Sequence, residues 1–126
     1  MGFKEEFYAK DAYAQLLGIV LLEVQDGYAS VSMEIKPEHK NGADMAHGGV
    51  IFSLADFAFA AASNSHGSLA LGISAHISFL KAATKTRLYA QAREISRNKK
   101  LATYDIRVTD EEGALIATFS GMVYIK

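Results

Sequence analysis

The spacing of hydrophobic positions predicts two helices in the first half of the chain. Apolar residues at roughly helical spacing predict a first helix over about residues 4–17, which Gly18 is placed to end in a left-handed cap. An almost wholly apolar segment over about residues 48–64 predicts a second, longer helix, and Gly67 follows it as a stop signal. Because this helix is apolar nearly all round, it must be covered on most of its sides.

Alternation of apolar and polar positions predicts the strands. Segments 20–24 and 28–35 flank Gln25-Asp26-Gly27, and an Asp-Gly turn between such segments is typical of a β-hairpin. After Gly67 the alternation continues and predicts four more strands, over 69–80, 87–96, 101–109 and 114–125. Short polar turns between the later strands predict an antiparallel meander.

These elements predict one α+β domain over residues 1–126, in which a curved antiparallel sheet wraps around the long helix. A chain of this length is large enough to form a single core. We find no internal repeat, no low-complexity tract and no linker, and segment 37–46 is expected to be a loop.

Composition narrows the classes of function. The formal net charge of −1 provides no global field for nucleic acid or an anionic membrane, so we expect neither as a partner. The absence of cysteine excludes disulfides and thiolate chemistry, and a cytoplasmic location is the default. The first residues lack the order of a signal peptide, and the apolar run 16–22 is too short to cross a bilayer. The mean hydropathy of +0.08 favours an oligomer.

The segment His47-Gly48-Gly49 opens the long helix, and Asp56 follows eight residues after Gly48. The first N–H groups of a helix have no partner inside it and lie at the positive end of its dipole, where glycines let a ligand oxygen approach. Gly48 is therefore a candidate oxyanion donor. A lone carboxylate among apolar side chains is costly to bury, so Asp56 is a candidate nucleophile or general base.

The separation of these two groups predicts a dimer. Eight residues of helix span roughly 12 Å, whereas a reacting carbonyl must lie about 3 Å from both its oxyanion donor and its nucleophile. One helix cannot supply both groups to one substrate. If they cooperate, they come from two copies of the helix packed antiparallel about a two-fold axis, which gives two equivalent sites.

Small and polar residues form a stripe along the long helix, spaced by three or four positions. Its members are Gly49, Ser53, Asp56, Ala60, Ser63 and Asn64. The small members would let a substrate or another helix approach, which makes Gly49, Ser53 and Ser63 candidate substrate-binding residues. Alternatively, Asp56 meets an arginine or a backbone group at a subunit interface and only fixes the register of the two chains.

His47 and Asn41 each have a chemical and a structural interpretation. His47 is able to orient a substrate carbonyl, to bond the facing Asp56, or to cap the helix that follows it. Asn41 is able to hold an attacking water or Asp56, or it is a turn residue before Gly42. The four histidines lack the close spacing of metal ligands, so we expect no metal site.

Two further groups are candidate ligand contacts. Arg97, Lys99 and Lys100 lie in one turn compact enough to meet a phosphorylated group at the rim of a cleft, although such charges are usually a solvated face. Aromatic residues able to line a pocket for an aromatic group, although more often core, are Phe52, Phe57, Phe59, Tyr89 and Tyr104.

The chain resembles the hot-dog-fold acyl-CoA thioesterases of the phenylacetate-pathway (PaaI-type) group. The resemblance covers nearly the whole chain in order, and its specific part runs from Asn41 through His47-Gly48-Gly49 and Ser53-Leu54-Ala55-Asp56 to Gly67. It implies a sheet wrapped around the central helix, and dimers with continuous sheets that commonly pair into homotetramers. It also implies hydrolysis of an acyl-CoA without a metal or redox cofactor.

The resemblance further implies a role for each matching residue. The N–H of Gly48 would polarise the thioester carbonyl, with His47 and Asn41 positioning groups around it, and Asp56 of the facing subunit would attack or activate water. The chain departs from the pattern at Ala82, where these proteins often carry proline, and at His76, where we expect a smaller polar residue. The acyl group is expected to be aryl-acetyl or hydroxylated benzoyl, with a medium aliphatic chain second.

Two other functions are compatible with these residues. A hot-dog hydratase or dehydratase acting on acyl thioesters would use His47 and Asp56 as acid and base. A non-catalytic acyl-CoA binding module would use Asp56 only to hold its dimer. Release of a thiol from a saturated acyl-CoA distinguishes hydrolysis from the hydratase or dehydratase and from the binding module, since neither of these produces a thiol.

Overall fold

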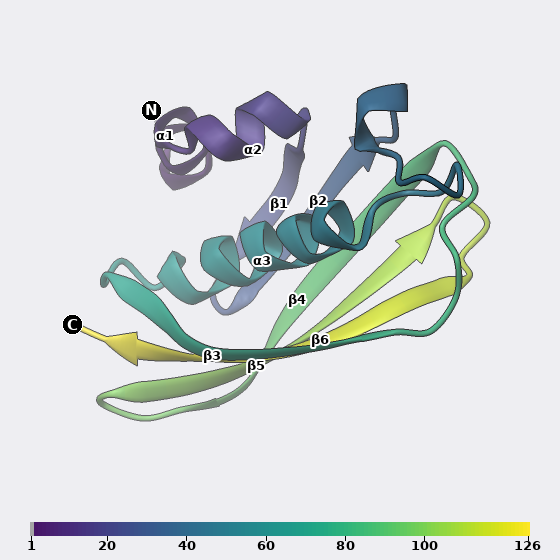
Figure 1. Ribbon diagram of the computed structural model, residues 1–126. Helices are drawn as coiled ribbons and strands as arrows, with labels where there is room; N and C mark the ends of the chain where they lie inside the picture. The colour runs from purple at the N-terminus through teal and green to yellow at the C-terminus, as the bar shows by residue number, and fades with distance from the viewer. Residues whose placement is uncertain (1) are drawn as a thin grey trace.

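The structure is a computed structural model that describes residues 2–126 (Figure 1). Its elements in chain order are α1 (Phe3–Lys10), α2 (Ala12–Leu17), β1 (Val20–Gln25), β2 (Tyr28–Glu34), the 3₁₀ turn η1 (Pro37–His39), α3 (Gly48–Asn64), β3 (Ala70–Phe79), β4 (Arg87–Arg97), β5 (Leu101–Asp110) and β6 (Leu115–Ile125). The strands form one antiparallel sheet in the order β1-β2-β4-β5-β6-β3. The sheet curves around α3, which confirms the predicted α+β architecture.

The N-terminal segment forms two helices rather than the single helix predicted over 4–17. Asp11 breaks the helical path because its backbone is not helical and its carboxylate accepts a hydrogen bond from the N–H of Ala14 at 2.9 Å. Aspartate is among the preferred residues for this N-cap position. After the break, α2 lies beside α3, above it in Figure 1.

The meander predicted for the last four strands extends only over β4, β5 and β6. β3 pairs with β6 instead of β4, and it therefore forms one edge of the sheet while β1 forms the other. The alternation of residues along a strand specifies which face is buried but not which strand lies beside it. The hairpin between β1 and β2 and the bounds of α3 agree with the prediction.

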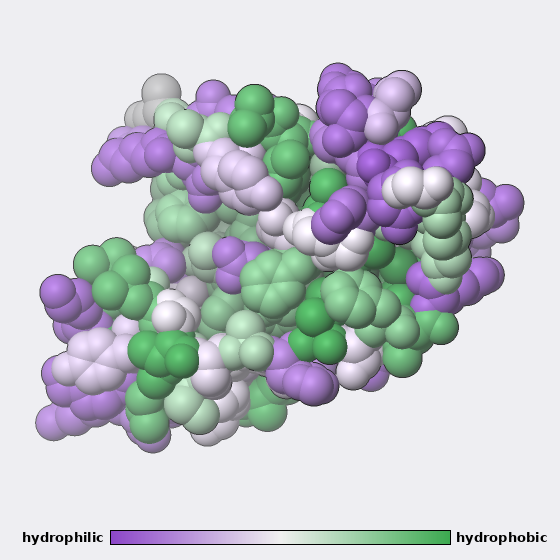
Figure 2. Space-filling view, in the orientation of Figure 1, coloured by the Kyte–Doolittle hydropathy of each residue, from purple (hydrophilic) through white to green (hydrophobic). Residues whose placement is uncertain are grey.

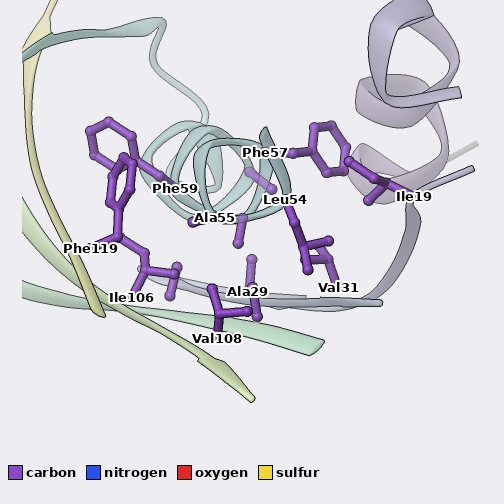
Figure 3. Packing of buried hydrophobic residues seen from close by; sticks show 14 of the residues in the cluster. Ile19, Ala29, Val31, Leu54, Ala55, Phe57, Phe59, Ile106, Val108 and Phe119 are labelled. Atoms are coloured by element: carbon purple, nitrogen blue, oxygen red, sulfur yellow. The ribbon is translucent and has the colours of Figure 1, made fainter. Parts of the chain in front are cut away.

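The core lies between α3 and the concave face of the sheet. Leu54 and Ala55 of α3 face Val31 and Ala29 of β2, and all four side chains are fully buried (Figure 3). On β5, alternate residues pack under the helix, and the buried apolar ones are Ala102, Tyr104, Ile106 and Val108. The other flank of α3 is covered by α1 and α2, and Phe7 and Tyr8 of α1 pack against Phe57.

Phe59 of α3 contacts the sheet where two glycines leave its backbone bare. A Cβ atom on Gly121 of β6 would lie 2.6 Å from Cζ of Phe59, and one on Gly72 of β3 would lie 3.2 Å from Cε2 of the same ring. Any side chain at position 121 would therefore displace the ring. Phe59 also packs against Tyr104 and Phe119, with ring centroids 5.7 and 5.6 Å away.

The edge strand β3 exposes large apolar side chains. Leu71 is 50% exposed and Ile73 is 57% exposed, and Phe79 lies at the end of the same strand. Figure 2 shows hydrophobic side chains gathered over the lower half of this view, along the course of β3. No helix within residues 2–126 is both long enough and apolar enough to span a membrane.

Candidate active site

His47 caps the N-terminus of α3. Its backbone is extended, and its Nδ1 accepts a hydrogen bond from the N–H of Gly49 at 2.9 Å. Because Nδ1 is the acceptor, a neutral imidazole carries its proton on Nε2, and the exposed ring presents that N–H as a donor. The backbone N–H of His47 is held by the carbonyl of the buried His39 at 2.8 Å. The capping interpretation of His47 is thus observed, and it leaves one ring nitrogen for a ligand.

Gly48 carries the free N–H group of this helix end. The N–H of Gly49 bonds to His47, and the N–H groups of Val50 and Ile51 bond to the carbonyl of His47 at 2.9 and 3.2 Å. Within residues 2–126, no oxygen or nitrogen accepts the N–H of Gly48. Since α3 has 17 residues, its dipole adds partial positive charge at this point. The N–H of Gly48 is available to a ligand oxygen.

A pocket of about 290 Å³ opens beside Gly48. Ile51 forms one side, and the segment Phe79-Leu80-Lys81-Ala82 after β3 forms another. A Cβ atom on Gly48 would lie 3.3 Å from Cζ of Phe79, so glycine keeps this approach open. The sequence departure at Ala82 therefore lines this pocket.

Asn41 organises the loop that precedes the helix. Its side-chain Oδ1 accepts hydrogen bonds from the N–H groups of Ala43 and Met45, at 2.9 and 3.3 Å, and its backbone N–H donates to the carbonyl of Met45 at 2.8 Å. This is the turn role considered for Asn41. Because Oδ1 is occupied, the side-chain NH₂ group is the part of Asn41 left to contact a ligand.

Asp56 lies on the accessible face of α3, whereas the sequence suggests a position among buried side chains. The residue is exposed, whereas Ala55 and Phe57 on either side of it are buried. Neighbouring protein atoms still withdraw its carboxyl partly from solvent, which raises its pKa, and the negative charge of Asp11 raises this pKa further. Gly49, Ser53, Asp56 and Ala60 form the stripe that remains accessible.

Ser53 links the accessible stripe to α2. Its hydroxyl donates to the carbonyl of Gly49 at 2.8 Å and lies 3.1 Å from the hydroxyl of Tyr13. Tyr13 is 57% exposed. Sequence reasoning missed both Tyr13 and Asp11, because it placed them in a continuous helix rather than beside α3. The capping preference of aspartate was the one signal able to reveal that break.

Two predicted substrate-binding residues lie away from the accessible stripe. Ser63 is 1% exposed, and its hydroxyl donates to the carbonyl of Ala60 at 3.2 Å. Phe57 is 4% exposed beneath α1. Among the other aromatic candidates, Phe59 and Tyr104 are core residues, and Phe52 packs edge-on against Phe119. Burial leaves Phe57 and Phe59 without access to a ligand in this subunit, and Tyr104, although buried, lines a hollow with residues of β3, β5 and β6.

The basic turn between β4 and β5 lies at the other end of α3. Glu94, just before this turn, accepts a hydrogen bond from Tyr104 at 2.7 Å and lies 2.8 Å from Nε2 of His66, which follows α3. Lys99 is exposed, and Lys100 lies over the ring of Tyr124. Within one chain, Arg97, Lys99 and Lys100 are therefore separated from Gly48 by the length of the helix.

The remaining histidines have local partners. Nδ1 of His39 accepts a hydrogen bond from the N–H of Lys36 at 3.0 Å, and Nε2 of His76 lies 3.4 Å from the hydroxyl of Ser78. Across residues 2–126, no three His, Asp or Glu side chains gather as ligands of a metal ion would.

Comparison with known proteins adds an independent line of information. The family model described as the thioesterase superfamily matches residues 44–117, which include Gly48 and Asp56. A relative from Archaeoglobus fulgidus, which bears an esterase name, is 48% identical over 96% of this chain and 79% of its own length. Acyl-coenzyme A thioesterase PaaI of Escherichia coli is 36% identical over 90% of this chain and 82% of its own length.

A solved structure gives the same result at the level of the fold. The structure of the E. coli PaaI protein from the phenylacetic acid degradation operon superimposes on this chain with a TM-score of 0.94 and 34% identity. The superposition covers 97% of this chain and 89% of that one. The likeness thus includes the helix, the sheet and the N-terminal segment together.

Proposed function

The chain belongs to the thioesterase superfamily, has the hot-dog fold and is a thioester hydrolase, and on this premise we propose that it hydrolyses acyl-CoA thioesters to free acid and CoA. In the proposed reaction, Gly48 of one subunit polarises the thioester carbonyl, and Asp56 of the facing subunit acts as nucleophile or general base. The observation that carries the proposal is the unpaired N–H of Gly48 at the mouth of a pocket.

The oxyanion assignment follows from the hydrogen bonds of the helix end. Attack on a thioester places negative charge on the carbonyl oxygen, and a preorganised N–H that needs no rearrangement stabilises that charge. His47 fixes Gly49 and thereby orients the first turn, while the N–H of Gly48 has no partner among residues 2–126. The Nε2 proton of His47 and the NH₂ group of Asn41 are proposed as further contacts to the substrate.

A homodimer is the proposed functional unit. Gly48 and Asp56 of one chain are separated by roughly 12 Å along the helix, which is too far for one thioester. Two features support pairing: the accessible stripe on α3 and the edge of β3, where unpaired backbone groups and exposed apolar side chains meet. Pairing of dimers into a homotetramer would satisfy the same requirement.

The same arrangement gives the basic turn a role. With Gly48 of one subunit opposite Asp56 of the other, the C-terminal end of each antiparallel α3 extends past the N-terminal end of its partner. Arg97, Lys99 and Lys100 of one subunit would then lie on the side of Gly48 of its partner. We propose that they contact the phosphates of CoA there. An aryl acyl group of the phenylacetyl or hydroxyphenylacetyl type is the proposed substrate, on the basis of the similarity to PaaI.

Mixing two inactive variants tests the shared site. Gly48→Pro removes the N–H donor, and Asp56→Asn removes the carboxylate. When the two are dissociated together in equal amounts and reassociated, each mixed dimer has one site with both groups intact. We expect thiol release from phenylacetyl-CoA to recover to roughly a quarter of the wild-type activity under random pairing.

The control is the same treatment of each variant alone, with subunit exchange followed by native mass spectrometry. No recovery despite complete exchange would mean that one chain supplies both groups, which contradicts the proposed site. Recovery that appears only with exchange supports it.

The pH profile provides a test of the environment of Asp56. Both proposed roles need the carboxylate, so activity falls as the pH drops through the raised pKa of Asp56. Removing the charge of Asp11 lowers that pKa, so Asp11→Asn is expected to move the acidic limb of the kcat/KM profile to lower pH. Asparagine caps helices as well as aspartate does, which keeps α2 in place. An unshifted acidic limb would contradict the assignment of this limb to Asp56.

A further inference from the structure

His39 is the one buried histidine within residues 2–126. It is 5% exposed, whereas the other three histidines are exposed or half-buried. It ends the 3₁₀ turn η1 and is the buried residue of that turn, in the dark blue segment between β2 and α3 in Figure 1. Burying a polar ring is costly unless its nitrogens are hydrogen-bonded. The imidazole is therefore held by specific partners, and it lies beside the loop that leads into the candidate active site.

The ring of His39 closes the η1 turn. Its Nδ1 accepts a hydrogen bond from the N–H of Lys36 at 3.0 Å, and the N–H of His39 donates to the carbonyl of Lys36 at 2.9 Å. Lys36 and His39 are thus joined through the side chain and through the backbone. An acceptor at Nδ1 requires a neutral ring that carries its proton on Nε2. The geometry of the turn therefore depends on an acceptor atom at the position of Nδ1.

The backbone of His39 holds the residue that caps α3. Its carbonyl accepts a hydrogen bond from the N–H of His47 at 2.8 Å. Lys40 and Ala46 form an isolated antiparallel bridge next to this bond, and the N–H of Ala46 donates to the carbonyl of Ala83 at 3.1 Å. The intervening segment is a closed loop whose two ends meet at His39 and His47. A displacement of His39 is therefore transmitted to His47 through one hydrogen bond.

The position of His47 sets the direction of the Gly48 N–H. The carbonyl of His47 and the N–H of Gly48 belong to the same planar peptide group, so neither turns without the other. That carbonyl accepts the first N–H groups of the helical ladder, and the ring of His47 accepts the N–H of Gly49 at 2.9 Å. These bonds fix the peptide group from the helix side. The hydrogen bond to His39 fixes it from the loop side.

We propose that His39 is a positioning residue, whose buried ring fixes His47 and thereby holds the Gly48 N–H in the direction of the thioester oxygen. This inference rests on the proposed function, in which that N–H stabilises the oxyanion. An oxyanion donor is effective because it is in place before the reaction begins. His39 does not contact the substrate, and it acts through two hydrogen bonds and one peptide plane.

Two substitutions of His39 separate its acceptor atom from its bulk. Leucine fills much of the space of the ring but has no acceptor, whereas asparagine is smaller but carries Oδ1 close to the position of Nδ1. We expect His39→Leu to lower kcat for phenylacetyl-CoA by about tenfold to 10²-fold, the effect of misplacing a catalytic group by about 1 Å. KM is expected to stay nearly unchanged, because the donor acts on the transition state. His39→Asn is expected to recover most of the lost kcat.

Glu38→Leu is the matched control, because it places the same side chain one residue earlier, on the exposed side of η1. It is expected to keep the wild-type kcat and KM. If the ring of His39 served only to fill space, leucine would be tolerated better than asparagine. A higher kcat in His39→Leu than in His39→Asn would therefore overturn the proposal.

A double-mutant cycle tests whether His39 acts through Gly48. Gly48→Pro lacks the N–H that His39 is proposed to direct, so His39→Leu has little left to remove in that background. We expect the double variant to have nearly the same kcat as Gly48→Pro alone. Losses that multiply in full would show that His39 acts by another route, which contradicts the proposal.

Amide hydrogen exchange of the protein without substrate separates this inference from the proposed function. His39 keeps its backbone carbonyl in every variant, so the exchange of the His47 N–H reports only whether that carbonyl has moved. We expect His39→Leu to raise this exchange rate by about threefold to tenfold, the equivalent of one hydrogen bond, and His39→Asn to retain protection. An unchanged rate in His39→Leu would overturn the positioning role. The expected exchange pattern in a protein that hydrolyses no thioester would overturn only the proposed function.

Discussion

Replacing Asp56 by asparagine is expected to lower kcat/KM for acyl-CoA hydrolysis by about 10²- to 10⁴-fold, the usual contribution of a positioned general base. Asparagine has nearly the same shape but cannot accept a proton or attack a carbonyl at neutral pH. The side chain is exposed on α3 and its removal opens no cavity, so the fold is expected to remain intact. Thiol release from phenylacetyl-CoA and from a saturated aliphatic acyl-CoA measures the effect.

Asp26→Asn is the matched control for this substitution. It removes one carboxylate in the β1–β2 turn, where Asn-Gly is as favourable as Asp-Gly, so activity should stay at the wild-type level. Wild-type hydrolysis by Asp56→Asn would exclude Asp56 from the chemistry. It would favour the alternative in which Asp56 only fixes the register of the dimer.

Single-turnover reaction in ¹⁸O-labelled water then distinguishes the two roles of the carboxylate. A nucleophilic Asp56 passes through a mixed anhydride, and attack of labelled water on the aspartyl carbonyl releases the acid and leaves one ¹⁸O in the side chain. A general base delivers the labelled oxygen directly to the released acid. Mass spectrometry of the peptide that contains Asp56 reads the outcome.

Gly48→Pro is expected to lower kcat by about 10²- to 10³-fold, the loss typical of one oxyanion donor. Proline has no N–H, yet it is a favoured residue at the first position of a helix. The preceding residue, His47, already has the extended backbone that proline requires, with φ −64° and ψ 140°. The substitution therefore removes the proposed donor while the start of α3 is retained.

Gly48→Ala separates the loss of the donor from the added bulk. Both variants place a Cβ atom about 3.3 Å from Phe79, but only proline removes the N–H group. We expect alanine to retain most of the activity that proline loses. Equal losses in the two variants would assign the effect to crowding by Phe79, and the oxyanion role of Gly48 would then be wrong.

The sequence pattern was sufficient to predict where most helices and strands lie along the chain. It was not sufficient to predict which strands pair with each other. The bounds of α3 follow from a glycine-rich start and a long apolar run, both of which are local signals. The position of β3 beside β6 depends on contacts between segments about 45 residues apart, which alternation along one strand does not encode. The break at Asp11 was encoded locally, in a capping preference that competed with apolar spacing.

The sequence was sufficient to identify Gly48 and Asp56 as candidate site residues, but not to predict which other residues surround them. Gly48 and Asp56 stand out because their chemistry is unusual for an apolar helix. The exposure of Asp56 was not predictable, because it depends on where α1 and α2 cross α3. The same crossing brings Asp11 and Tyr13 to the stripe and buries Phe57. These placements are properties of tertiary packing, and the residue pattern alone leaves them open.

The absence of a side chain at Gly121 has a consequence for the orientation of the Asp56 carboxylate. Phe59 follows Asp56 by three residues on the same helix, and its ring rests against the sheet where Gly121 and Gly72 have no side chains. This contact sets the roll of the helix about its long axis. A methyl group at position 121 would displace Phe59 and rotate α3 about its axis. The carboxylate of Asp56 would then point away from the thioester. The orientation of Asp56 toward the substrate therefore depends on Gly121 of β6, a residue that does not contact the substrate.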